Sequence, residues 1–400
     1  MLLNILIIFF TSQTSSYAQT FVKAQPDLAE SKLFSKIENI EMYTDTKEEV
    51  LVENMPIYKS QDGLPVCSGC ATSVVIQKFI CDTKKISNCA DENLVKPDFS
   101  INSLAMFALA TPINSDPKLN KQFTNYESLN FNSGGIGYNI LITAMTDFSF
   151  YTEKCYAFDQ FANRYGQNYT LMNTILSKLK TSYEKNKKQL ISKLDSNEKI
   201  TLTEANSECP DCLNNLKNQI QNDFFKTQDT EIILEGLSKN TFDEFLFTSL
   251  FGNCNTKSFK KPNSVEYFPK NNEDKVTRTQ AIDKIKDILK KQKPIVADSL
   301  CSVVHKNNPK ACIYSHALVI SGYKEVCNKN KCKKLFKVHN CEGKDWQDQT
   351  GSWFDAETLL DQQIKETDKT VKINDSEYAI MENRNENTLM EQKRFSWLEY

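Results

Sequence analysis

Four side chains of this sequence have the chemical types that nucleophilic acyl transfer requires: Gln61, Cys67, His316 and Asn340. An imidazole can take the proton of a thiol, and the thiolate that forms can attack a carbonyl carbon. One side-chain amide can hold the imidazole in a single tautomer, while the other donates a hydrogen bond to the oxyanion. These residue types predict nucleophilic catalysis by a cysteine.

Cys67 stands where a helix is expected to begin. After a turn signal with glycine and proline, apolar residues recur at a spacing of four: Ala71, Val75 and Phe79. This spacing predicts a helix with one buried face. We expect the positive end of the helix dipole to stabilise a thiolate at Cys67. Gln61 lies six residues earlier, on the loop that approaches the helix, and its amide can fold back toward an oxyanion beside the sulfur.

A second cysteine leaves alternatives open in this region. Cys67 and Cys70 are spaced as CxxC, so they can form a structural disulfide with each other or with cysteines elsewhere. Either sulfur is a candidate nucleophile. A zinc site that combines them with Cys209 and Cys212 is disfavoured, because the two pairs lie much further apart than in compact zinc modules.

His316 and Asn340 are expected on two strands of one hairpin. His316 precedes an apolar run at 317–323, and Asn340 follows an alternating run at 335–339. If residues whose numbers add to 656 lie opposite each other, the two side chains face one another, with about 5 Å between Cβ atoms. A slip of one residue would separate them. The alternative is a histidine that only packs at the end of a strand.

The order of glutamine, helix-opening cysteine, distant histidine and asparagine resembles the papain-like cysteine peptidases of the C1 family. Short matches elsewhere support the resemblance: 99–104 is similar to "LS-x-x-x-L", 133–135 to "NGG", 294–301 to the "P-V-x-V" strand, 315–323 to "HAV-x-x-x-GY", and 338–343 stands in the place of "K-N-S-W-G". The match spans about residues 56 to 361 and is interrupted by a long insertion. It implies an α+β fold with two lobes, a helical lobe carrying Cys67 and an antiparallel β lobe carrying His316 and Asn340.

The same resemblance implies a role for each residue. Cys67 would be the nucleophile, His316 the general base and acid, Asn340 the residue that orients the imidazole, and Gln61 the oxyanion donor. Gly134 and Gly135 would line the substrate cleft. The implied substrate is a peptide or protein, and the implied reaction needs no cofactor and no metal.

The sequence also departs from the family pattern. Ser68 stands where the family prefers an aromatic residue, and Cys341 and Glu342 stand where a tryptophan would shield the histidine–asparagine bond. Trp346 is a candidate substitute for that tryptophan. These departures keep a second hypothesis open, a catalytically inactive papain-like scaffold that binds a partner or has a structural role.

The chain order predicts how the protein is organised. Helical patterns come first and short β-like runs later, which favours an α+β fold with segregated lobes. We divide the chain into a signal peptide at 1–18, an N-terminal segment at 19–55, a peptidase domain at 56–365 with a polar, largely helical insertion at about 155–290, and a polar, peripheral tail at 366–400. Within the insertion, Leu171, Ile175, Leu179, Tyr183 and Leu190 recur at helical spacing.

The N-terminus and the cysteines predict export. Residues 1–18 contain an apolar run and end in Ser16-Tyr17-Ala18, which fits a signal-peptidase site, and the run is too short to span a bilayer. A secreted or periplasmic protein without membrane insertion is therefore expected. Thirteen cysteines fit disulfides in such a compartment, and the odd number leaves at least one sulfur unpaired within the chain. Proximity suggests four pairs: Cys81–Cys89, Cys209–Cys212, Cys301–Cys312 and Cys327–Cys332.

Composition bounds the remaining possibilities. With 400 residues, of which 40% are hydrophobic, the chain can bury a sizeable core. A net charge of −2 gives no reason to expect a nucleic-acid partner, because binding to phosphates needs a concentrated basic surface. The sequence does not specify an oligomeric state.

Overall fold

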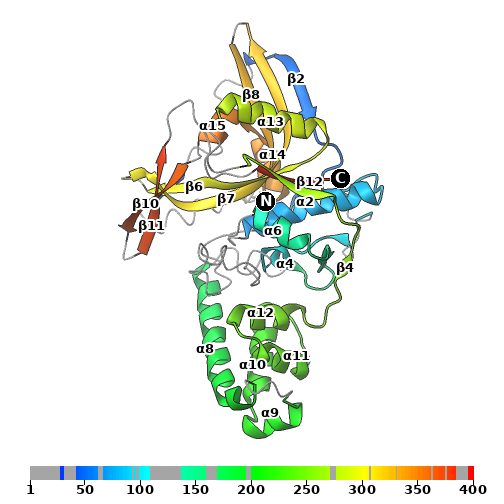
Figure 1. The fold of residues 1–400 in the computed structure, drawn as a ribbon, viewed down its shortest axis with the longest axis vertical. Coiled ribbons are helices and arrows are strands. Elements are labelled where there is room, and N and C mark those ends of the chain that lie inside the picture. The colour runs from blue at the N-terminus through cyan, green and yellow to red at the C-terminus, as the bar shows by residue number, and fades with distance from the viewer. Residues whose placement is uncertain are drawn as a thin grey trace, which may run out of the picture.

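The structure is a computed structural model, and it describes residues 28–30, 42–61, 66–91, 94–95, 99–108, 137–158, 169–194, 200–270, 276–305, 308–329, 331–361, 364–373, 376–383 and 395–400. The predicted signal peptide and the predicted cleft residues Gly134 and Gly135 lie outside the described residues. The described part combines helices with an antiparallel sheet, so the chain is an α+β protein (Figure 1).

The helices fall into two groups in space, one beside the sheet and one that projects away from it (Figure 1). Those beside the sheet are α2 (Cys67–Thr83), α4 (Ser103–Ala108), α6 (Gly137–Ala144), α13 (Arg278–Lys290), α14 (Gly343–Thr350) and α15 (Ala356–Asp361). The projecting group contains α8 (Tyr169–Leu194), α9 (Leu202–Glu208), α10 (Cys212–Phe224), α11 (Thr230–Ser238) and α12 (Phe242–Phe251).

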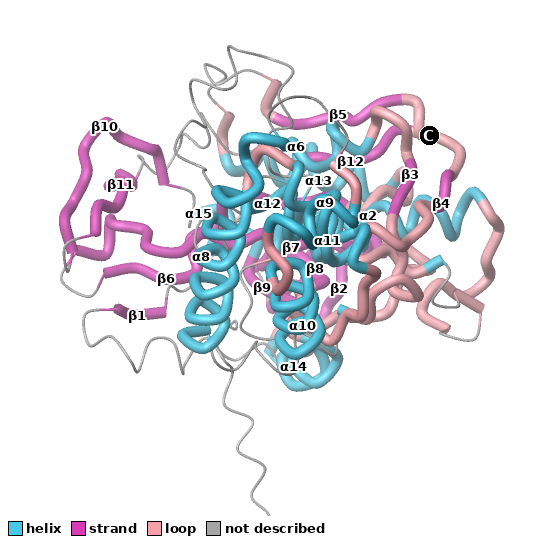
Figure 2. Tube along the Cα trace, turned by 90° about the horizontal axis from the view of Figure 1, so that it is seen from below, coloured by secondary structure: helices cyan, strands magenta, loops and turns pink. Residues whose placement is uncertain are grey.

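A ten-stranded antiparallel sheet forms the other half of the architecture, with β10-β11-β7-β6-β12-β5 as its main path. Its strands are β1 (Leu28–Glu30), β2 (Asp45–Leu51), β5 (Ser264–Phe268), β6 (Ile295–His305), β7 (Asn308–Asn328), β8 (Lys331–His339), β9 (Trp353–Asp355), β10 (Ile364–Ile373), β11 (Ser376–Asn383) and β12 (Phe395–Glu399). A separate pair joins β3 (Ser149–Phe150) to β4 (Lys257–Ser258). The long strands β6 and β7 extend sideways with β1, β10 and β11 (Figure 2).

The central part of the sheet is covered on both faces. Alternate residues of β6 and β7 enter different cores, because successive side chains of a strand point to opposite faces. Leu318 and Ile320 pack in the core that contains α13 and α15. Ala317 and Val319 pack in the core that contains α2 and α6. The strand that carries His316 is therefore fixed between two helical layers.

The predicted hairpin is present as β7 and β8, but the predicted register is wrong. Val319 lies opposite His339 and Tyr323 opposite Phe336, so the numbers of paired residues add to 658 or 659. The register shifts between Ile320 and Gly322. A Cβ at Gly322 would come within 2.9 Å of side-chain atoms from both neighbouring strands, so this crowded position needs glycine.

Helix α2 begins at Cys67, as the spacing predicts, but it is buried on every side rather than on one face. It packs against α4 and α6 and against β6, β7 and β12 of the sheet. Its inward polar side chains are satisfied locally, since Thr72 donates to the carbonyl of Ser68 and Ser73 to that of Cys70. Burial all round holds the first turn of α2, and with it Cys67, in a fixed place.

The helical insertion is shorter than the sequence suggests. Helices α8 to α12 share one apolar core, and the disulfide Cys155–Cys254 joins the two ends of this segment. Beyond it, β5 pairs with β12 and α13 packs on the sheet, so the boundary at about 290 is wrong. Helix α8 follows the predicted spacing, except that Leu171 is 41% exposed.

Both terminal segments contribute to the sheet, which corrects two further expectations. Strand β2, inside the segment expected to be loose, pairs with β7. Strand β12, inside the expected peripheral tail, pairs with β5 and β6. Phe395 and Trp397 enter one core and Leu398 the other, so this last strand is central to the packing. No helix within the described ranges is long and apolar enough to cross a membrane.

Candidate functional site

The imidazole of His316 and the amide of Asn340 form a hydrogen bond, with 2.7 Å between Nε2 and Oδ1. The backbone N–H of Cys341 also donates to Oδ1, at 3.0 Å, which fixes the amide with its oxygen toward the histidine. A carbonyl oxygen only accepts, so Nε2 must carry the hydrogen. In the neutral ring Nδ1 is then the basic nitrogen, which is the tautomer a general base needs.

This contact forms although the register differs from the predicted one. Asn340 comes directly after the last residue of β8, so it is not held to the ladder geometry of that strand. His316 pairs with Leu300 of β6 on its other side. Both side chains are buried, and Gln347 donates to the backbone carbonyl of Asn340 at 3.3 Å. The pair is thus enclosed by the fold.

Cys67 is a free cysteine, and Cys70 is not. Cys70 forms a disulfide with Cys341, with 6.3 Å between Cα atoms, so the helix that begins at Cys67 is joined covalently to the residue after Asn340. A disulfide between Cys67 and Cys70 is therefore wrong, as is the zinc interpretation, because Cys209 is bonded to Cys212. Of these two CxxC sulfurs, only that of Cys67 is available as a nucleophile.

The other disulfides agree with proximity where the side chains are described. Cys81–Cys89 and Cys327–Cys332 form as expected, as does Cys209–Cys212. Cys155–Cys254 was not expected, because its partners are 99 residues apart. The side chains of the fourth expected pair, Cys301 and Cys312, lie outside the described residues.

The thiol of Cys67 lies against the strand that carries the histidine. It makes a hydrogen bond with the backbone of Ala317, the residue after His316. Burial raises the pKa of the thiol to about 11, with smaller increases from the charges of Asp298 and Glu342. The expected thiolate stabilised by the helix dipole is thus opposed by desolvation, which outweighs it because the side chain is only 6% exposed. Cys67 needs a base to lose its proton near neutral pH.

Backbone hydrogen bonding holds Gln61 beside Cys341, the residue that follows Asn340. Its N–H donates to the carbonyl of Cys341 at 2.9 Å, and the neighbouring residue Ser60 forms a β-bridge with Glu342. The side chain is buried, and its Oε1 has no hydrogen-bond partner among the described residues. Gln61 is therefore held beside the residues that follow Asn340.

No model of a known protein family matches the sequence. No curated protein matches it either.

Trp346, the candidate shield for the histidine–asparagine bond, stacks on Phe354 with 5.6 Å between ring centroids. That contact places the indole against the core on the far side of the sheet from α2. Gln347, its neighbour, instead contacts the backbone of Asn340. Gln347 and the Cys70–Cys341 disulfide are the groups bonded to Asn340 and to the residue that follows it.

Two residues of the site were missed from the sequence. Cys341 stands directly after Asn340, but no spacing rule connects it with Cys70, 271 residues away. Asp298 is an acid inside the apolar run 295–300, and it is 3% exposed. A lone carboxylate in a buried strand must find hydrogen-bond donors, and that requirement is the signal that would have identified it.

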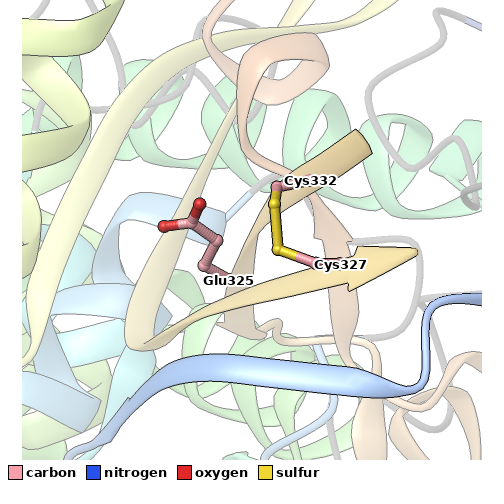
Figure 3. Close-up of side chains that lie close together, drawn as sticks. All are labelled: Glu325, Cys327 and Cys332. Atoms are coloured by element: carbon pink, nitrogen blue, oxygen red, sulfur yellow. A yellow bond between two sulfur atoms is a disulfide. The ribbon is translucent and has the colours of Figure 1, made fainter. Parts of the chain in front are cut away.

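One group of side chains within the described residues has the spacing of metal ligands: Glu325, Cys327 and Cys332. Figure 3 shows that the two sulfurs are joined to each other, as the disulfide bond requires. A disulfide sulfur is not a thiolate ligand, so this group does not make a metal site. The disulfide instead links β7 to β8 near the end of their hairpin.

Proposed function

We propose that the protein is an exported cysteine-type peptidase of the papain-like kind, with Cys67 as nucleophile, His316 as general base and acid, and Asn340 as the residue that orients the imidazole. Gln61 is the oxyanion donor. In this proposal α2 and its neighbouring helices form the helical lobe, and the strands around β7 form the β lobe. The substrate is a peptide bond in a peptide or protein.

One observation carries the proposal. A free, buried thiol at the start of a central helix contacts the backbone of Ala317, next to a histidine whose Nε2 is engaged by Asn340. A thiol, a correctly protonated imidazole and an orienting amide are the parts that nucleophilic catalysis needs. These groups come from three distant parts of the chain. The Cys70–Cys341 disulfide joins the helix that begins at Cys67 to the residue after Asn340.

The reaction follows from these groups. Nδ1 of His316 takes the proton of Cys67, and the thiolate attacks the carbonyl carbon to form a C–S bond. The amide of Gln61 and the backbone N–H of Cys67 stabilise the oxyanion. The imidazolium gives its proton to the leaving amine as the C–N bond breaks. Water, deprotonated by His316, then hydrolyses the acyl-enzyme and releases the thiol.

The raised pKa of Cys67 favours a second candidate, an inactive scaffold. A thiol with a pKa of about 11, buried to 6% exposure, is inert unless a base pairs with it. If His316 does not reach the sulfur in solution, the same fold is a binding or structural protein. The two functions differ in the reactivity of one thiol.

Export is part of the proposal. Disulfides persist in oxidising compartments, and the described residues contain five of them, including three that join cysteines close in sequence. This content is compatible with a secreted or periplasmic protein. Localisation of the full-length chain, with and without residues 1–18, would test it directly.

Hydrolysis is tested with the purified, unreduced protein and a mixture of peptides of varied sequence, read by mass spectrometry for new termini. The proposal predicts cleavage by the wild-type protein and none by Cys67→Ala or His316→Ala. Cys327→Ser with Cys332→Ser, which removes a distant disulfide, is the matched control and should retain cleavage. Cleavage that persists in Cys67→Ala would contradict the assignment of the nucleophile.

A further inference from the structure

Asp298 connects the sheet to the helix that follows the predicted cleft residues. It lies on β6 and is 3% exposed. Its two carboxylate oxygens accept hydrogen bonds from the first backbone N–H groups of α6, from Gly137 at 2.9 Å and from Tyr138 at 3.2 Å. Bonds from N–H donors to a carboxylate are charge-assisted and stronger than neutral ones. The start of α6 is thus tied to β6.

The fit between these two elements leaves no spare room. A Cβ at Gly137 would lie 2.7 Å from Cγ1 of Val296 and 2.9 Å from Oδ1 of Asp298. A larger residue at this position requires the side chains of Val296 and Asp298, or the helix itself, to shift. Gly137 follows by two residues Gly135, which the resemblance to papain-like peptidases assigns to the substrate cleft.

The anchor stands beside the reactive groups. The register between β6 and β7 shifts between Ala297 and Leu300, and Leu300 is the residue paired with His316. Bulges of this kind redirect side chains next to active sites. The charge of Asp298 also reaches Cys67, where it raises the pKa of the thiol together with the charge of Glu342.

We propose that Asp298 is a positioning residue of this site, whose carboxylate anchors the start of α6 on β6 and adds negative charge beside Cys67. A role of Asp298 in catalysis rests on the proposed function. Its two physical parts, the anchor and the charge, are measurable without any substrate.

Three variants separate the two parts. Asp298→Asn removes the charge and one acceptor. Gly137→Ala disturbs the anchor but keeps the charge. Glu342→Gln removes the other acidic charge that acts on Cys67, from the loop after Asn340. Two readouts apply to each folded variant: hydrogen exchange of the backbone amides at Gly137 and Tyr138, and the pH profile of Cys67 alkylation by iodoacetamide.

Asp298→Asn should speed exchange at both amides by roughly tenfold or more, because hydrogen bonds to a charged acceptor are lost. It should also move the alkylation profile to lower pH, since removing a nearby negative charge stabilises the thiolate. Gly137→Ala should speed exchange without that shift. Glu342→Gln should shift the profile without speeding exchange.

The inference is overturned if Asp298→Asn changes neither readout. If that variant does not fold, unchanged exchange at Tyr138 in Gly137→Ala overturns the anchor. Where peptide hydrolysis is measurable, both anchor variants should lower kcat/KM by roughly tenfold or more, as misplaced binding elements do. If the wild-type protein hydrolyses no peptide, the proposed function fails, while the exchange and alkylation results still decide the role of Asp298.

Discussion

Nε2 of His316 and Oδ1 of Asn340 are 2.7 Å apart, and the amide that accepts this bond also accepts one from the backbone of Cys341. Two donors on one oxygen leave a single orientation for the amide and a single tautomer for the imidazole. The backbone N–H of Cys341 thus determines, through the amide of Asn340, that Nε2 of His316 carries the hydrogen. This relationship connects the end of β8 with the tautomer of the imidazole.

Replacing Asn340 should weaken the site without abolishing it. Asn340→Ala removes the acceptor, so the histidine samples both tautomers and loses its fixed orientation. We expect Cys67-dependent hydrolysis or alkylation to fall by about 10²-fold, the low end of what a positioned general base contributes. Asn340→Asp keeps an acceptor for both donors and should retain more of the rate. Equal rates in Asn340→Ala and the wild type would show that the bond has no role in reactivity.

The Cys70–Cys341 disulfide should matter for both stability and reactivity. Replacing both cysteines by serine removes a covalent bond between residues 271 positions apart. Because the unfolded chain then gains conformational freedom, we expect the free energy of unfolding to fall by about 2 to 4 kcal/mol. Denaturant unfolding measures this loss, and Cys67 alkylation measures the effect on the site. The matched control is the serine pair at Cys327 and Cys332, which closes a short loop. A loss no larger than in the control would contradict the proposed fastening role.

His339 makes the stability depend on pH. Burial lowers its pKa from 6.5 to about 3, so the folded protein keeps this ring neutral where the unfolded chain protonates it. The unfolded state then binds more protons between these values, and the free energy of unfolding should fall by up to about 1.4 kcal/mol per pH unit as the pH drops below 6.5. Above pH 6.5 the ring is neutral in both states, and burying His339 carries no such pH-dependent loss of stability.

His339→Phe tests this dependence because it keeps a ring against Tyr58, which lies 4.1 Å away between centroids. Denaturant unfolding of both proteins at several pH values gives the slopes. The variant should lose less stability on acidification, and the two slopes should agree at alkaline pH. Identical slopes on the acid side would mean that His339 is protonated in the folded protein.

Local patterns predicted the parts of the site, and long-range packing decided how the parts meet. The start of α2 and the β7–β8 hairpin follow from apolar spacing, and the short-range disulfides follow from proximity. The register did not, because the shift at Gly322 arises where three strands crowd together. The Cys70–Cys341 bond joins segments that only the folded chain brings together, so no spacing in the sequence specifies it.

Burial explains the other differences. The four-residue spacing in α2 indicates one apolar face, but helices and the sheet cover its polar face too. That enclosure desolvates Cys67 and reverses the expected effect of the helix dipole on its pKa. The polar surroundings of β12 in the sequence concealed a strand whose two faces enter two different cores.

The most direct test of the account is the pH dependence of Cys67 alkylation in the unreduced protein. Limiting iodoacetamide is applied from about pH 5 to about pH 8, and the labelled cysteine is identified by mass spectrometry. If His316 takes the thiol proton, Cys67 is labelled on the acid side, and His316→Ala abolishes that labelling. If Cys67 is not labelled on the acid side and its labelling rises only toward the alkaline end of that range, with the same profile in His316→Ala, the thiol behaves as an unassisted thiol with a pKa of about 11 and the peptidase proposal is contradicted.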